Sequence, residues 1–171
     1  MLLSSLEQNQ FKSVELEQYS THGDLAARWL IDIHSFGDMQ EGCKVADLGS
    51  GNGAIGLGAL SLGASEAILV EADQMALEIA RRNAEEMGYA DSIQIIQAML
   101  GTDPVNIDYA DLIISNPPWG RQSPKADRPF LDAILSSQII SHIMHSAEAS
   151  HIETLFEGEG WSVERYGEAD F

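Results

Sequence analysis

Hydrophobic and polar positions follow two alternating patterns from Cys43 onward. Short runs of Val, Ile, Leu and Ala predict buried strands, and longer stretches with apolar residues roughly every third or fourth position predict amphipathic helices. Such alternation is typical of βαβ units around a parallel sheet. The predicted strands are 44–47, 67–70, 93–96 and 110–115, and the predicted helices between them are 54–62 and 73–87.

The flanking regions extend this pattern. An amphipathic helix is predicted over 24–36, before the first strand. In the C-terminal part the pattern indicates, less distinctly, a helix over 130–140, a fifth strand over 143–145, a helix over 148–157 and a sixth strand over 161–164. We therefore expect one α/β domain over residues 1–171, built on an open, mostly parallel sheet with helices on both faces, with 24–171 forming the sheet and helices.

Composition limits the classes of protein that fit. Hydrophobic residues make up 44% of the 171 residues, which is enough for one sizeable core. No apolar run approaches the roughly 18 residues that a membrane span needs, and Met1–Ser5 lacks a basic signal region, so we expect a cytoplasmic protein without membrane association. Cys43 is the single cysteine, which excludes an internal disulfide and a cysteine-based metal cluster, and no metal site is predicted.

The charge balance is strongly acidic, with 27 Asp and Glu against 9 Lys and Arg and a formal net charge of −18. This balance opposes nonspecific nucleic-acid binding, which relies on basic side chains neutralising phosphates. Arg121, Lys125 and Arg128 form a local exception that either contacts phosphate or is a solvated loop. An acidic surface is equally compatible with life in high salt, where repulsion between charges is screened.

A glycine-rich turn follows the first predicted strand and opens a helix. It runs from Asp47 to Gly53 with glycine at every second position from Gly49. Glycines let a ligand approach the backbone where a Cβ would clash, and turns at this end of a parallel sheet bind nucleotides. Glu71 ends the second strand about 20 positions after Gly51, where a carboxylate can accept hydrogen bonds from ribose hydroxyls. Turn and acid together predict a nucleoside site.

Two other interpretations of this turn have to be weighed. Residues 51–56 also match the G-x-G-x-x-G pattern of dinucleotide-binding proteins, which would indicate an NAD-dependent oxidoreductase. The acidic Asp47 at the start of the turn suits an amino-bearing ligand better than a pyrophosphate. The glycines could also serve only a tight strand-to-helix turn.

The sequence Asn116-Pro117-Pro118-Trp119 directly follows the fourth predicted strand. Prolines stop a central strand and hold the preceding residue out of the α region, so a rigid corner is expected. The side-chain carbonyl of Asn116 and the backbone carbonyl of Pro117 can converge on one planar NH2 group, and Trp119 offers a face for stacking a flat ring. These four residues are the predicted catalytic group. The alternative for Trp119 is a core aromatic beneath a loop.

Together, the turn, the acid and this corner resemble the S-adenosylmethionine (SAM)-dependent amino-methyltransferases. Residues 16–21, 76–86, Asp127 and 130–131 narrow the resemblance to the methyltransferase-like protein 5 family. This resemblance implies a Rossmann-like class I methyltransferase domain over 1–171, with 1–23 capping the cofactor. The implied activity is methylation of N6 of an adenosine in structured small-subunit ribosomal RNA.

The resemblance also implies which residues contact SAM. By position they are Gln18, Tyr19, Thr21, Asp47, Gly49, Gly51, Asn52, Gly53, Ala54, Glu71, Ala72, Met99 and Asn116. Two departures from the family stand out. The acid that usually follows the third strand is replaced by Gln97-Ala98-Met99, and the family continues past Phe171 with a further strand, so the last strand of the sheet is expected to be missing.

Several alternatives stay open. The Asn-Pro-Pro-aromatic motif also serves enzymes that methylate guanine N2 in ribosomal RNA, adenine N6 in DNA or a glutamine amide in protein, and a non-catalytic SAM-binding or partner subunit is a further possibility. The resemblance implies a small zinc-binding activator protein at the edge of the third strand, over 93–98. His22 and His145 are interpreted as structural residues, and Asp103 as a solvated loop residue.

Overall fold

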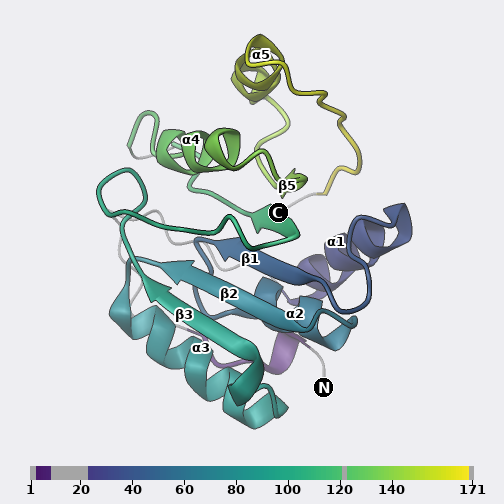
Figure 1. The fold of residues 1–171 in the computed structure, drawn as a ribbon, viewed down its shortest axis with the longest axis vertical. Coiled ribbons are helices and arrows are strands. Elements are labelled where there is room, and N and C mark those ends of the chain that lie inside the picture. The colour runs from purple at the N-terminus through teal and green to yellow at the C-terminus, as the bar shows by residue number, and fades with distance from the viewer. Residues whose placement is uncertain (1–2, 9–22, 121–122, 170–171) are drawn as a thin grey trace.

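The computed structural model describes residues 3–8, 23–120 and 123–169. Its centre is a sheet of five strands in the order β3-β2-β1-β4-β5, and all four strand pairs are parallel (Figure 1). The strands are β1 (Lys44–Leu48), β2 (Glu66–Glu71), β3 (Ile93–Gln97), β4 (Leu112–Ser115) and β5 (Ser141–Ile143). The predicted open α/β sheet is confirmed, and the first four strands lie within two residues of their predicted bounds.

Helices cover both faces of this sheet. One core packs α1, α2 and α3 against it, and a second core on the other face contains α4 and α5 (Figure 1). The helices are α1 (Gly23–Phe36), α2 (Ala54–Ser61), α3 (Gln74–Met87), α4 (Arg128–Ser137) and α5 (Ser150–Gly158), with short 3-10 helices η1 (Leu3–Ser5) and η2 (Ala90–Ser92). Helices on both faces explain why the central strands are nearly continuous in apolar residues.

Alternation along β1 assigns each residue to one of these cores. Val45 packs in the core beneath α1 and α2, whereas Ala46 and Leu48 pack in the core beneath α4. Successive side chains of a strand point to opposite faces, so Asp47 shares the face of Val45. Its carboxylate there accepts a hydrogen bond from the backbone N–H of Gly56 in α2, at 2.9 Å.

The C-terminal part differs from the prediction. The fifth strand is 141–143 rather than 143–145, and the sixth strand predicted over 161–164 is wrong, because these residues form no strand. Trp161 instead packs edge-on against Phe156 of α5, with ring centroids 5.4 Å apart. The apolar side chains that suggested a strand are thus used in the second core. Among the described residues, no helix has the length and apolar character needed to cross a membrane.

Candidate active site

Two turns leave neighbouring strands at the same edge of the sheet. Leu48 of β1 pairs with Ser115 of β4, and the Ser115 hydroxyl donates to the Leu48 carbonyl at 2.8 Å. The next residues, Gly49 and Asn116, therefore begin their turns side by side. The strand order reverses between β1 and β4, and open α/β sheets bind ligands at such a switch point. The geometry brings together the two motifs that the sequence singled out.

The three glycines of the first turn have different surroundings. All adopt positive φ, with +76° at Gly49, +53° at Gly51 and +82° at Gly53. A Cβ added to Gly49 would lie 2.9 Å from the ring of Phe130 in α4, and one added to Gly53 would lie 3.2 Å from Ala80 in α3. A Cβ at Gly51 would meet no described atom within 4 Å. Gly49 and Gly53 thus permit close packing, whereas Gly51 leaves open space for a ligand.

Glu71 is held against this turn. It is 9% exposed, and its carboxylate accepts three backbone N–H groups: Gly51 at 3.0 Å, Ala72 at 2.8 Å and Asp73 at 3.0 Å. Two of these bonds end on Oε1, whereas Oε2 accepts only that from Gly51 among the described residues. A carboxylate oxygen has about two acceptor positions, so Oε2 retains capacity for a hydroxyl donor.

Asp47 is fully buried at the base of the turn. Burial raises the pKa of its carboxyl to about 7, against the lowering effect of the hydrogen bond from Gly56. Its Oδ1 has no hydrogen-bond partner among the described residues. A buried carboxylate oxygen without a partner is costly, and a cationic amino group nearby would offset that cost. The arrangement fits the methionine ammonium of a SAM-type ligand.

The proline corner presents its polar and aromatic groups together. The indole N–H of Trp119 donates to Oδ1 of Asn116 at 3.2 Å. Trp119 and Asn116 are partly exposed, whereas Pro117 is buried. The ring of Trp119 stacks on His145, with centroids 5.9 Å apart and planes inclined by 23°. Trp119 is therefore no core aromatic, and it lies beside the amide that the sequence identified as catalytic.

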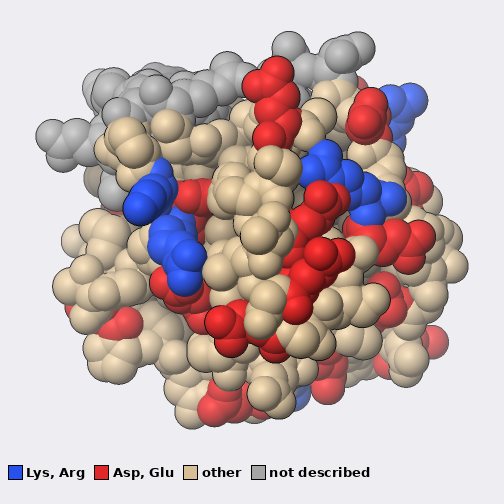
Figure 2. Space-filling model, turned by 90° about the horizontal axis from the view of Figure 1, so that it is seen from above, with Lys and Arg blue, Asp and Glu red and all other residues tan. Residues whose placement is uncertain are grey.

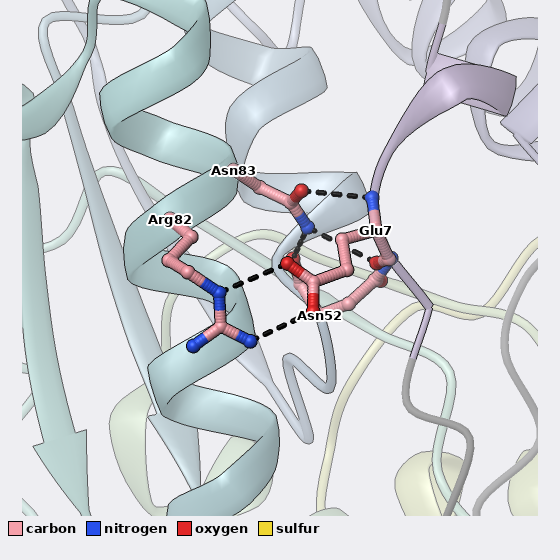
Figure 3. Close-up of polar contacts among 4 residues, drawn as sticks. All are labelled: Glu7, Asn52, Arg82 and Asn83. Carbon is pink, nitrogen blue, oxygen red and sulfur yellow. Dashed lines mark hydrogen bonds and ion pairs between the residues drawn. The ribbon is translucent and has the colours of Figure 1, made fainter.

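A clamp on the N-terminal segment adjoins the glycine turn, and sequence reasoning missed it (Figure 3). Glu7 donates its backbone N–H to Asn83 Oδ1 at 2.9 Å and accepts from Asn83 and Asn52 at its carbonyl. Its carboxylate accepts two hydrogen bonds from Arg82. The side chain of Asn52, expected to line the cofactor site, thus anchors residues 3–8 to the turn. The adjacent residues Arg82 and Asn83 of α3 carried no recognisable sequence signal for this contact.

The remaining predicted residues occupy varied positions. Gln18, Tyr19, Thr21, His22 and Arg121 lie outside the described residues. Ala54 is buried at the start of α2, and Met99 is 44% exposed beyond β3, where its N–H donates to Asp103 at 2.7 Å. Asp103 is thus engaged within its own loop. Arg128 pairs with Asp132 at 2.8 Å in an exposed contact of α4.

The family model of the methyltransferase small domain matches residues 20–138 of this chain. That span contains the glycine turn, Glu71 and the whole proline corner. The chain belongs to the methyltransferase small-domain family. This membership confirms the predicted class of enzyme and the predicted methyl donor, SAM, and excludes the NAD-dependent oxidoreductase.

Relatives of this methyltransferase include RNA-modifying enzymes. The chain is 30% identical over 154 residues to the rRNA N(6)-adenosine-methyltransferase METTL5 of Danio rerio, covering 86% of this chain and 72% of the relative. A solved structure from Pyrococcus horikoshii, described as a candidate RNA methyltransferase, superposes with a TM-score of 0.80 at 35% identity, over 92% of this chain and 79% of that one. An RNA methyltransferase of Salinibacter ruber, solved with S-adenosyl-L-homocysteine, shares the fold with a TM-score of 0.57 at 21% identity, over 74% of this chain and 76% of that one.

The methyltransferase also contains a cluster of ionisable side chains that the sequence did not predict. One ligand-type atom from each of Asp127, His145 and His151 lies within 4.8 Å of the others, beside Trp119. Asp127 lies at the start of α4, 18 residues before His145 in the loop after β5, and His151 follows in α5. Only the packing of these elements on one another brings them together, so no local pattern reveals the cluster.

Proposed function

We propose that this methyltransferase transfers a methyl group from SAM to N6 of an adenosine in small-subunit ribosomal RNA. The observation that carries the proposal is the pairing of Leu48 with Ser115, which opens the glycine turn and the Asn116 corner onto one edge of the sheet. The relative from Danio rerio, named as an rRNA adenosine N6 enzyme, supports this choice of acceptor. Residues 1–171 would act as one catalytic domain.

The cofactor side of the site would be formed by the turn and its neighbours. Oε2 of Glu71 would accept a ribose hydroxyl, the open side of Gly51 would admit the ligand, and Asp47 would face the methionine ammonium. When bound, SAM supplies an electrophilic methyl group on a sulfonium. The segment 1–23, anchored through Glu7, would cover the cofactor from the N-terminal side.

The acceptor side would be formed by the proline corner. Oδ1 of Asn116, which accepts the indole N–H, would with the Pro117 carbonyl accept the two N–H bonds of an adenine amino group. Accepting both bonds raises electron density on the nitrogen as positive charge develops. Catalysis then consists mainly of placing that nitrogen about 3 to 3.5 Å from the methyl carbon, in line with the breaking bond. Trp119 would stack the unpaired base.

The surface charge affects how RNA would approach. The face seen in Figure 2 carries many acidic side chains, and its described basic side chains are few and interspersed among them. RNA affinity depends largely on basic groups neutralising phosphates. We therefore infer that a partner supplies part of the basic surface. Among the described strands β3 pairs only with β2, and its outer edge suits strand addition by a small zinc-binding activator protein.

A pair of variants tests the proposal. Asn116→Ala should abolish methyl transfer to small-subunit RNA and leave SAM affinity near that of the wild type, because it removes the acceptor contact and the hydrogen bond from Trp119 but leaves the glycine turn and Glu71 intact. Gly51→Val should instead abolish SAM binding, measured by calorimetry, because it fills the open side of the turn.

Mass spectrometry of ribosomal RNA from cells with and without the protein identifies the modified nucleotide. Methyl groups found on guanine, on DNA or on a glutamine amide would refute the assigned acceptor. Full activity of Asn116→Ala would refute the assigned role of the corner.

A further inference from the structure

The ring of Trp119 rests on a polar cluster formed by Asp127, His145 and His151. The indole lies against His145, whose side chain is 7% exposed. Nε2 of His145 is 3.3 Å from Oδ2 of Asp127, which is 8% exposed, and the same oxygen lies 2.6 Å from Nε2 of His151 in α5. The cluster thus connects the indole to two elements of the second core, the start of α4 and α5.

Two histidines and a carboxylate are also typical ligands of zinc. Whether this cluster binds a metal or supports the Trp119 indole depends on which ring nitrogens carry protons. The backbone N–H of Ser146 donates to Nδ1 of His145 at 2.9 Å. A ring nitrogen that accepts a hydrogen bond carries no proton, and burial lowers the pKa of His145, so the neutral ring holds its proton on Nε2. Nε2 then has no lone pair for a metal. It lies 3.3 Å from Oδ2 of Asp127 but makes no hydrogen bond among the described residues.

His151 fits the same arrangement. A carboxylate can only accept, so the 2.6 Å contact requires that Nε2 of His151 is the donor. The separation is that of a hydrogen bond and is shorter than the distance between two ligands on one metal ion. Oδ2 of Asp127 therefore accepts from His151, and the His145 ring packs beside this pair with Nε2 3.3 Å from the same oxygen.

The other end of the chain of contacts reaches the catalytic amide. An indole N–H is only a donor, so its contact with Asn116 must be made to the carbonyl oxygen and not to the NH2 group. This contact sets which way the amide points. Phenylalanine or tyrosine in the position of Trp119 could stack a base but could not make this hydrogen bond.

We propose that His145 is a positioning residue for methyl transfer: its ring, fixed at Nδ1 by the backbone N–H of Ser146, supports the Trp119 indole, and the indole N–H in turn orients the side-chain carbonyl of Asn116. This role of His145 rests on the proposed function, because the contacts from His145 through Trp119 to Asn116 affect catalysis only if Asn116 binds the methyl acceptor. It makes the flat ring of His145, and not its ability to titrate, the property that matters.

The test compares two substitutions of His145 that separate these properties. His145→Gln keeps a polar side chain but removes the ring, and should lower kcat about tenfold, since small errors in placing the reacting groups have large effects. His145→Phe keeps a flat ring and should lose clearly less. The affinity for SAM should stay at the wild-type value in both. His34→Gln, an exposed histidine of α1 on the other face of the sheet, is the matched control.

A second measurement needs no RNA. The fluorescence of Trp119 is identified as the part of the signal that Trp119→Phe removes. Quenching of this part by acrylamide reports how accessible the indole is. Quenching should increase in His145→Gln and stay near the wild-type value in His145→Phe. If the wild type does not methylate RNA but this quenching pattern holds, the proposed function fails and the support of Trp119 by His145 stands.

Other results would overturn the inference. It is wrong if kcat of His145→Gln equals that of the wild type, if His145→Phe is as slow as His145→Gln, or if quenching does not change. Stoichiometric zinc in the purified protein, removed by a chelator and lost in Asp127→Asn, would identify a metal site and refute the assignment of the proton on Nε2.

Discussion

Replacing Asn83 by alanine should destabilise the protein far more than its position on a surface helix suggests. The Asn83 side chain is fully buried and makes three hydrogen bonds: it accepts from Glu7 N at 2.9 Å and donates to Glu7 O at 3.2 Å and to Asn52 O at 3.0 Å. At about 1 kcal/mol net for each, their loss lowers the free energy of unfolding by about 3 kcal/mol. For a chain of this length this corresponds to a melting temperature lower by about 6 to 12 °C.

The neighbouring residue provides the matched control. Arg82 contacts the same Glu7 through an ion pair of 2.7 Å, but the two side chains are 51% and 47% exposed. Water screens such an exposed pair, so it contributes little to stability. Arg82→Ala should therefore lower the melting temperature by only a few degrees. The two variants remove contacts to one residue and differ chiefly in burial.

Thermal and urea unfolding of both variants measure the difference, and calorimetry with SAM measures its consequence. Asn83→Ala should also weaken SAM binding, because the predicted contacts at Gln18 and Thr21 follow the anchored segment in the sequence. If Arg82→Ala proves as destabilising as Asn83→Ala, or if Asn83→Ala changes the free energy of unfolding by less than about 0.5 kcal/mol, burial does not decide the strength of this clamp.

Further predictions concern Asp47 and two glycines. Burial raises the folded-state pKa of Asp47 from 3.8 to about 7, so its contribution to stability is present below pH 4 and is lost as pH rises through 7. Over that range the free energy of unfolding of the wild type, relative to that of Asp47→Asn, should fall by up to about 4 kcal/mol. Urea unfolding at several pH values measures this difference, and a difference that does not change with pH would contradict the prediction. Gly23→Ala places a Cβ 2.2 Å from the backbone nitrogen of Ser4 and should cost about 1 to 3 kcal/mol; an unchanged melting temperature would mean that η1 moves aside freely. Gly51→Ala should lower the free energy of unfolding by about 1 kcal/mol, because Gly51 has a positive φ. The loss of SAM binding free energy, measured by calorimetry, should be larger than this loss of stability. A loss of stability larger than the loss of binding free energy would mean that the open side of the turn does not face the cofactor.

The central elements could be predicted because their signals are local. The apolar runs that form β1, β2 and β4 are buried on both faces, and the helix over 74–87 begins and ends where its sequence indicates. Asp73 accepts from Met75 N at 2.8 Å as an N-cap, and Gly88 ends the helix at φ 78°. Caps and left-handed glycines depend on neighbouring residues alone, so they do not require knowledge of the tertiary structure.

The C-terminal part was less predictable for a related reason. The alternation over 161–164 is equally compatible with an edge strand and with an irregular segment on an apolar surface. Trp161 packs on Phe156, and no strand in the described part of the chain pairs with residues 161–164. Whether a partner strand is available is a property of the whole sheet.

The sequence by itself determined the chemistry of the site: glycines that permit positive φ, prolines that impose a corner, and an amide and an indole within four residues. Each follows from steric limits and side-chain groups that act over a few bonds. Only the tertiary structure decided what surrounds them, namely Phe130 against Gly49, Glu7 between Asn52 and Asn83, and Asp127 beside His145. These contacts join residues distant along the chain, and their distances depend on how the helices pack on the two faces of the sheet.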